Sequence, residues 1–110
     1  MLAIEKAKYI GDYNIHLCFN DGREGVADLK KTIFEDRRPI FSELKEKSNF
    51  SSFRIAHGTI VWPNRLDLAP EYLFYLTFRE DNHYQEQFRR WGYQSSAAPQ
   101  ASSFAPSQSA

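Results

Sequence analysis

A short stretch of alternating side chains near the N-terminus constrains the fold most strongly. From Tyr13 to Phe19 every second residue is apolar. The intervening positions carry polar side chains or a thiol, namely Asn14, His16 and Cys18. This period of two predicts a strand with one face on a core and one toward solvent. Asp21-Gly22 follows at once, a pair typical of a tight type I′ hairpin turn.

The flanking segments extend this strand into a sheet. Residues 3–10 have the composition of a preceding strand, and Gly11-Asp12 marks a turn after them. Residues 23–29 then form the returning strand of the hairpin. The sequence therefore predicts a three-stranded antiparallel meander, roughly the smallest sheet that is stable with one apolar face.

The second half predicts a shorter hairpin and one or two short helices. Two apolar segments, 53–55 and 59–62, flank His57-Gly58 as the arms of a hairpin. Pro39 and Pro70 each suit the first position of a helix. Together with the meander, these elements define an α+β fold class.

A further helical stretch is predicted near residue 90. Tyr84, Phe88 and Trp91 follow the spacing i, i+4, i+7 of an amphipathic helix, and Gly92 is suited to end it. Beyond it, residues 95–110 are only Ser, Ala, Pro and Gln with a single Phe104. Such a segment cannot bury enough apolar surface to offset the entropy of ordering it. We therefore expect one domain at 1–94 and a disordered tail at 95–110.

Composition and charge argue against several classes of function. The chain has 14 basic and 14 acidic residues, so its formal net charge is zero and it has no long-range field for nucleic acid or anionic lipid. Its apolar segments are too short to cross a bilayer. One cysteine allows no intramolecular disulfide, and the N-terminus is charged by Glu5, unlike a signal peptide. We expect a cytoplasmic protein without a membrane partner.

Cys18 and His16 are the residues closest to a catalytic or metal-binding pair. Two residues apart on one strand, they share a face, and an imidazole with a thiol can bind zinc or form a nucleophilic dyad. Their bases lie about 6–7 Å apart along the strand, beyond direct hydrogen-bond reach. Strong zinc signatures use two ligand pairs, and this is a single loose one. We expect no catalytic residue, metal or cofactor, and a small enzyme using Cys18 and His16 is the least favoured alternative.

Basic pairs raise the alternative of a nucleic-acid-binding regulator. They occur at residues 30–31, 37–38 and 89–90, and the last pair adjoins Trp91 and Tyr93. Arginines interleaved with aromatic rings can bind phosphates and stack on bases. Each pair has acidic neighbours, however, so a mixed-charge solvated surface is the preferred interpretation.

An aromatic and Arg-rich segment, residues 72–93, predicts a protein-binding surface. These residue types are enriched at interface hot spots. Two short helices on a small sheet are not expected to bury all of this aromatic area. The candidate partner-binding residues are Tyr84, Phe88, Arg89, Arg90, Trp91 and Tyr93.

Three segments of the sequence resemble a known family. They are the hairpin at 15–29, Pro39-Ile40-Phe41 and, most specifically, residues 58–73, which contain Trp62-Pro63-Asn64 and Asp67-Leu68-Ala69-Pro70. Over residues 1–76 the chain is similar to a bacterial family of small proteins known as domain of unknown function 2442. The resemblance implies a compact α+β fold with an antiparallel sheet and assigns no catalytic residues.

The resemblance also implies a kind of partner. Some family members carry a helix-turn-helix domain after this region, and many are encoded beside another small protein, which suggests toxin–antitoxin pairs. Too few residues follow Leu76 here for such a DNA-binding domain. We therefore expect a non-enzymatic protein-interaction module that binds a protein partner or itself, with an antitoxin-like or accessory role.

The residues of the family motif have an architectural interpretation of their own. Trp62 supplies core area, Pro63 ends a strand, Asn64 closes a turn and Pro70 starts a helix. Because local turn chemistry accounts for these residue types, we expect the motif to be structural. Its members are Trp62, Pro63, Asn64, Asp67, Ala69 and Pro70.

Overall fold

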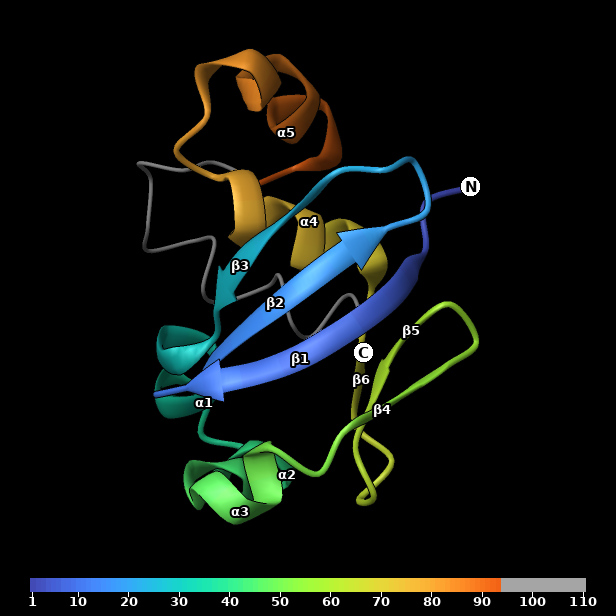
Figure 1. Cartoon of the computed structure of the whole chain (residues 1–110). Helices are drawn as coiled ribbons and strands as arrows, with labels where there is room; N and C mark the ends of the chain where they lie inside the picture. Colours follow the sequence, from blue (N-terminus) through green and yellow to red (C-terminus); the bar gives the residue numbers. More distant parts are fainter. Residues whose placement is uncertain (94–110) are drawn as a thin grey trace.

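The computed structural model describes residues 1–93 of the 110-residue chain, and the tail predicted at 95–110 lies outside them (Figure 1). The strands are β1 (Ile4–Gly11), β2 (Asn14–Phe19), β3 (Glu24–Asp28), β4 (Arg54–Ala56), β5 (Thr59–Val61) and β6 (Asp67–Leu68). The α-helices are α1 (Lys30–Glu35), α2 (Pro39–Ser42), α3 (Lys47–Phe50), α4 (Pro70–Phe78) and α5 (Gln85–Trp91). Two 3-10 turns are η1 (Glu43–Lys45) and η2 (Asn82–Tyr84).

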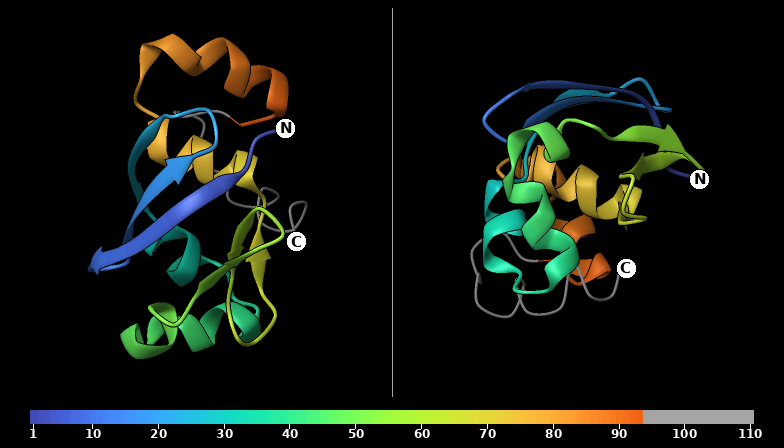
Figure 2. Two further views of the ribbon diagram at one scale, coloured as in Figure 1. Left: turned by 45° about the vertical axis from the view of Figure 1, so that its right-hand side comes forward. Right: turned by 90° about the horizontal axis from the view of Figure 1, so that it is seen from below.

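The predicted meander is confirmed as an antiparallel sheet of order β1-β2-β3, called here the N-terminal sheet. Its apolar positions on β2, namely Ile15, Leu17 and Phe19, are at most 1% exposed. The helices pack on this inner face, and the opposite face is open to solvent (Figure 2). The α+β fold class is therefore confirmed.

The turn chemistry differs from the prediction at Asp21-Gly22. A type I′ turn needs positive φ at both central residues, and of this pair only Gly22, with φ 90°, has it. Instead Asn20, Asp21 and Gly22 form a three-residue loop, closed by bonds from the Gly22 amide to the Phe19 carbonyl and from the Phe19 amide to the Arg23 carbonyl. Glycine in the left-handed conformation ends this kind of loop.

The second hairpin is confirmed, and it has the tight turn. His57 (φ 55°) and Gly58 (φ 79°) are both left-handed, as a two-residue type I′ turn requires. The short β6 adds a third strand, giving a second sheet of order β4-β5-β6. The Ile4 amide donates to the Gly58 carbonyl over 2.8 Å, which links the N-terminal sheet to the second sheet.

The helices form a layer behind the N-terminal sheet. The helices expected at Pro39 and Pro70 begin at those residues, and Gly92 ends α5 in the left-handed conformation, with φ 91°. Helix α1 was not predicted and follows directly on β3. Helix α4 packs against β3, and at Gly25 an added Cβ atom would lie 2.6 Å from the Thr77 Cγ2 atom. Among residues 1–93, no helix has the length and apolar character needed to span a membrane.

Candidate functional site

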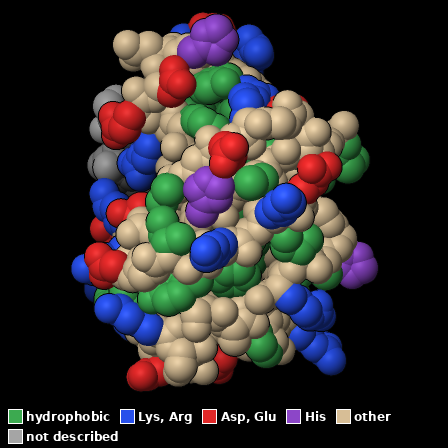
Figure 3. Space-filling model, in the orientation of Figure 1, with side chains coloured by type: hydrophobic (Ala, Val, Ile, Leu, Met, Phe, Trp, Pro, Cys, Tyr) green, Lys and Arg blue, Asp and Glu red, His purple; other side chains and the backbone are tan. Residues whose placement is uncertain are grey.

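The outer face of the N-terminal sheet carries a compact group of polar and ionisable side chains. The strand register sets two rungs across it, one through Lys6, Cys18 and Glu24 and one through Lys8, His16 and Val26. Figure 3 views this face, where a histidine, an acidic side chain and basic side chains lie close together near the middle. This face is one of the two candidate sites in the described chain.

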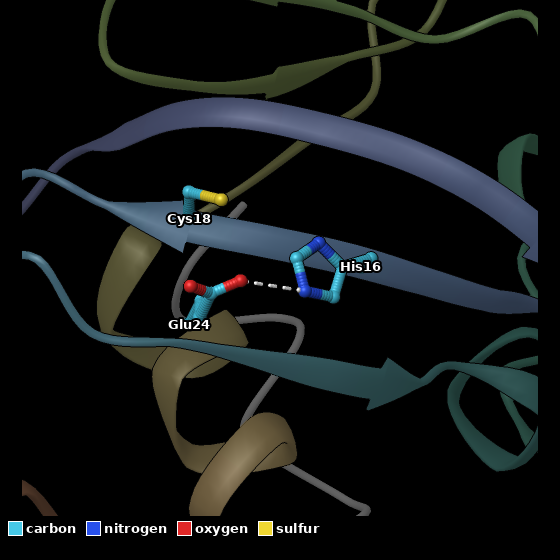
Figure 4. A group of neighbouring side chains, drawn as sticks. All are labelled: His16, Cys18 and Glu24. Carbon is cyan, nitrogen blue, oxygen red and sulfur yellow. Dashed lines mark ion pairs between the residues drawn. The ribbon is translucent and has the colours of Figure 1, made fainter.

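Three side chains of this face converge on one point (Figure 4). The His16 Nε2 atom lies 3.0 Å from the Glu24 Oε1 atom, and the ligand atoms of His16, Cys18 and Glu24 all lie within 4.8 Å of one another. His16 and Cys18 are half-buried and Glu24 is exposed. The group therefore combines an imidazole, a thiol and a carboxylate at an accessible surface.

Sequence reasoning placed His16 and Cys18 on one face but missed Glu24. A two-residue loop at Asp21-Gly22 would set Glu24 opposite Phe19, on the core side of the sheet. The three-residue loop shifts the register by one position and sets Glu24 opposite Cys18, and such a slip moves a side chain to the other face. The alternation of Ala27 and Leu29 with Asp28 was the available signal for this register, in which the two apolar side chains are buried.

The second candidate site is a groove of about 340 Å³, the Trp91 groove, between the N-terminal residues, the β2–β3 loop and α5. Its lining includes Leu2, Asn20, Arg23, Phe74, Gln87 and Trp91. The groove combines the half-buried Trp91 indole with the half-buried Gln87 amide, which can form hydrogen bonds. Of the sequence-predicted partner residues, Trp91 lines it.

Arg23 is fixed in place at the wall of this groove. Its guanidinium carbon lies 4.5 Å from the centre of the Phe74 ring and 5.0 Å from that of Tyr84, within cation–π range. Its Nε atom donates to the Asp21 carboxylate over 2.8 Å, and this hydrogen bond lowers the pKa of Asp21. These contacts hold the Arg23 guanidinium in one position at the edge of the groove.

The structure corrects the expectation for two predicted partner residues. Phe88 is 1% exposed and Tyr93 is 8% exposed, so neither offers a surface to a partner. The reason is that α5 packs onto α4, with Phe88 edge-on to Tyr75 at 5.2 Å and Tyr93 stacked on Tyr75 at 4.9 Å between ring centres. The two helices bury their aromatic rings against each other as well as against the sheet.

The remaining predicted residues of this segment stay accessible. Tyr84 and Trp91 are half-buried, and Arg89 and Arg90 are exposed. Arg89 forms an ion pair with Glu86 over 2.5 Å, and this contact lowers the pKa of the Glu86 carboxyl. Because Glu86 offsets one of the two arginine charges, the basic patch on α5 is weaker than the sequence suggests.

A cluster of tyrosines lies beneath α5. Burial raises the pKa of Tyr93 to about 12 and also raises the pKa values of Tyr72 and Tyr75. The hydroxyl of Tyr72 shares a 2.6 Å hydrogen bond with the Thr32 hydroxyl of α1. These rings connect segments distant in sequence and remain un-ionised at neutral pH.

The sequence motif around Trp62 takes part in packing. The Trp62 indole donates to the Phe50 carbonyl over 2.8 Å, and its ring is 1% exposed. Asn64 donates to the Ile40 carbonyl and to Glu43, and accepts from the Leu66 amide. Pro63, Asn64 and Leu44 line part of a small hollow of about 150 Å³.

The rest of the motif leads from the second sheet into α4. Ala69 is the residue before the helix and Pro70 its first residue. Asp67 pairs with Val61 through the backbone in β6, and its side chain is exposed. The exposed Asp67 side chain does not point to a packing role, whereas the contacts of the other motif residues support an architectural one.

Comparison with known proteins identifies a family that covers most of the described residues. A family model described as "Protein of unknown function (DUF2442)" matches residues 4–78. This range holds the N-terminal sheet, the second sheet and α4, together with His16, Cys18 and Glu24. Helix α5, with Trp91, follows the matched range. No curated protein and no solved structure matches the chain.

Proposed function

This chain belongs to the DUF2442 family, and we propose that it is a non-enzymatic module that binds a protein partner through the Trp91 groove. The observation that carries the proposal is the groove itself, a hollow of about 340 Å³ with Phe74 and Trp91 in its lining. Trp and Arg are the residue types most enriched at binding hot spots. A half-buried indole beside a fixed guanidinium supplies both types at one place.

The composition of the groove suggests what it binds. Trp91 offers an apolar wall and Gln87 an amide that can bond to the peptide backbone, whereas Phe74 is fully buried and the Asn20 amide already bonds to the Met1 carbonyl and the Ala3 amide. Arg23 is already neutralised by Asp21, so the groove has little net attraction for a strongly anionic ligand. A partner segment with one large apolar side chain fits this chemistry better than a phosphate backbone does.

The proposed partner is a second small protein encoded beside this one, with the present chain as its antitoxin-like or accessory component. The interaction would take place in the cytoplasm, where a free thiol such as Cys18 stays reduced. Arg89 and Arg90, exposed on the same helix as Trp91, supply polar contacts at the rim of the interface.

The test is co-expression of the full chain with the product of the adjacent gene, followed by co-purification and titration. We expect a stable complex, and we expect Trp91→Ala to weaken it about 30-fold or more, since a hot-spot side chain contributes about 2 kcal/mol or more. Phe34→Ala is the matched control, because Phe34 is an aromatic residue 44% exposed on α1, outside the groove lining. That variant should bind as the wild type does.

Other outcomes would reassign the surface. A dimer of the chain alone that Trp91→Ala dissociates would make the groove a self-association site. Salt-sensitive binding of nucleic acid that is lost in the Arg89→Ala, Arg90→Ala double variant would favour the regulator instead. A complex that tolerates Trp91→Ala without loss of affinity would refute the groove as the binding site.

A further inference from the structure

We propose that His16, Cys18 and Glu24 form a binding site for a zinc ion on the outer face of the N-terminal sheet. This inference is independent of the Trp91 groove and of the proposed partner. It starts from the observation that an imidazole nitrogen, a thiol sulfur and a carboxylate oxygen lie within 4.8 Å of one another. Among residues 1–93, no other group of three His, Cys, Asp or Glu side chains has its possible ligand atoms this close together.

The spacing of these atoms is close to that of a zinc site. Zinc binds histidine nitrogen, cysteine sulfur and carboxylate oxygen in a tetrahedron with bonds of about 2.0 to 2.3 Å, so neighbouring donor atoms lie about 3.5 Å apart. His16 and Glu24 already approach to 3.0 Å. Closing the remaining separations takes a movement of about 1 Å, which side-chain rotation at an accessible surface allows.

The backbone orients the three ligands before any ion binds. His16 and Cys18 project from the same face of β2, the central strand, and Glu24 lies directly opposite Cys18 on β3 (Figure 4). Because β2 is paired on both sides, the bases of these side chains have fixed positions. An ion held by all three would link β2 to β3 at the end of the hairpin.

The donor set selects the class of metal. A thiolate and a carboxylate together balance the two charges of the ion, and thiolate with imidazole favours zinc over magnesium or calcium, which prefer oxygen ligands. Lys6 and Lys8, opposite these residues on β1, oppose a purely electrostatic attraction for cations. A metal with strong bonds to sulfur is therefore the best fit. Three protein ligands leave the fourth position to a water molecule.

Cobalt provides the direct test, because Co²⁺ adopts the zinc geometry and shows a charge-transfer absorption when a thiolate binds it. The full chain would be titrated with Co²⁺ under a reducing agent that does not bind metals. We expect the band to saturate at one Co²⁺ per chain and to disappear on addition of Zn²⁺, but not of Mg²⁺ or Ca²⁺. Zinc should also raise the melting temperature of the wild type.

Single substitutions assign the ligands. Cys18→Ser should abolish the band, and His16→Gln and Glu24→Gln should each weaken Co²⁺ binding by more than about tenfold, since losing even a hydrogen-bond partner of a ligand costs about that much. His83→Gln is the matched control, since His83 is an exposed histidine on η2 and should leave binding unchanged. All these positions are surface or half-buried, so circular dichroism should show an intact fold.

Three results would overturn the proposal. The first is the absence of a saturable thiolate band in the wild type. The second is unchanged affinity in both His16→Gln and Glu24→Gln, which would mean that Cys18 binds cobalt alone. The third is displacement of cobalt by Mg²⁺ or Ca²⁺, which would exclude a site selected by sulfur.

Discussion

At the scale of single residues, Tyr13 combines two features that are rarely found together. Its backbone is left-handed, with φ 65°, which is unfavourable for a bulky aromatic residue, and its side chain is 5% exposed. The ring lies edge-on to Phe34 and Phe50, each 5.2 Å away between ring centres, and the hydroxyl donates to the Lys45 carbonyl. These contacts hold the tyrosine in the turn between β1 and β2.

Removing the hydroxyl alone should therefore lower stability. We expect Tyr13→Phe to reduce the free energy of unfolding by about 1 kcal/mol, because a partly buried carbonyl loses its donor while the ring stays in place. Urea denaturation followed by tryptophan fluorescence measures the change. Tyr9→Phe is the control, since within residues 1–93 the Tyr9 hydroxyl has no hydrogen bond, and it should change stability little. Equal effects of the two substitutions would contradict this account.

At the scale of elements, the contact between β3 and α4 depends on the absence of a side chain at Gly25. A Cβ atom there would lie 2.6 Å from the Thr77 Cγ2 atom, closer than such atoms approach. Thr77 cannot readily rotate away, because its hydroxyl donates to the Leu73 carbonyl over 2.7 Å. The strand and the helix would have to separate.

We expect Gly25→Ala to destabilise the protein by about 1 to 3 kcal/mol, the usual range for overpacking. Thr77→Ser removes the clashing methyl group and keeps the hydroxyl, so it should rescue much of this loss. A double-mutant cycle in urea measures the coupling between the two sites. Additive effects, with no rescue by Thr77→Ser, would show that the methyl contact is not the cause.

For the whole molecule, the tyrosines connect elements that are far apart in sequence. Tyr72 of α4 binds Thr32 of α1, while Tyr93, just after α5, stacks on Tyr75. Burial raises the pKa of Tyr93 to about 12 from its ordinary value of 10.0. Ionisation of a buried ring therefore opposes the assembly of these helices.

The sign of the pH dependence follows from this shift. Between pH 10 and about 12 the unfolded state releases the Tyr93 proton while the folded state keeps it, so the free energy of unfolding falls as pH rises. The stabilising effect is complete below pH 10. Urea denaturation at one pH below 10 and one between 10 and 12 should show a smaller decrease for Tyr93→Phe than for the wild type. Equal decreases would exclude Tyr93 as the cause.

These features also show how far sequence reasoning reaches. The alternation from Ile15 to Phe19 defines the central strand without any tertiary information, because burial of one face needs only a period of two. Pro70 predicted where α4 begins and Gly92 where α5 ends, because both signals depend only on the local backbone conformation. The two-residue β6 could not be predicted, since Asp67-Leu68 is too short to show a period.

The sites depended on tertiary contacts that the sequence does not display. The sequence predicted Phe88 and Tyr93 to be accessible, but both are buried. Their burial results from the packing of α5 on α4, a contact between helices that the local sequence does not show. Glu24 joined His16 and Cys18 only through one extra residue in the β2–β3 loop. A single position of register decided which face of the sheet that carboxylate occupies.

The hydrogen bond between Ile4 and Gly58 has a consequence for the order of folding. Strand β1 can pair with β2 once about the first twenty residues have left the ribosome, since this hairpin is local. Its other contact must wait until residue 58 has been synthesised. The second sheet can therefore join β1 only after the turn at residues 57–58 has been made, and the outer edge of β1, the edge strand of its sheet, is a place where a neighbouring chain can pair.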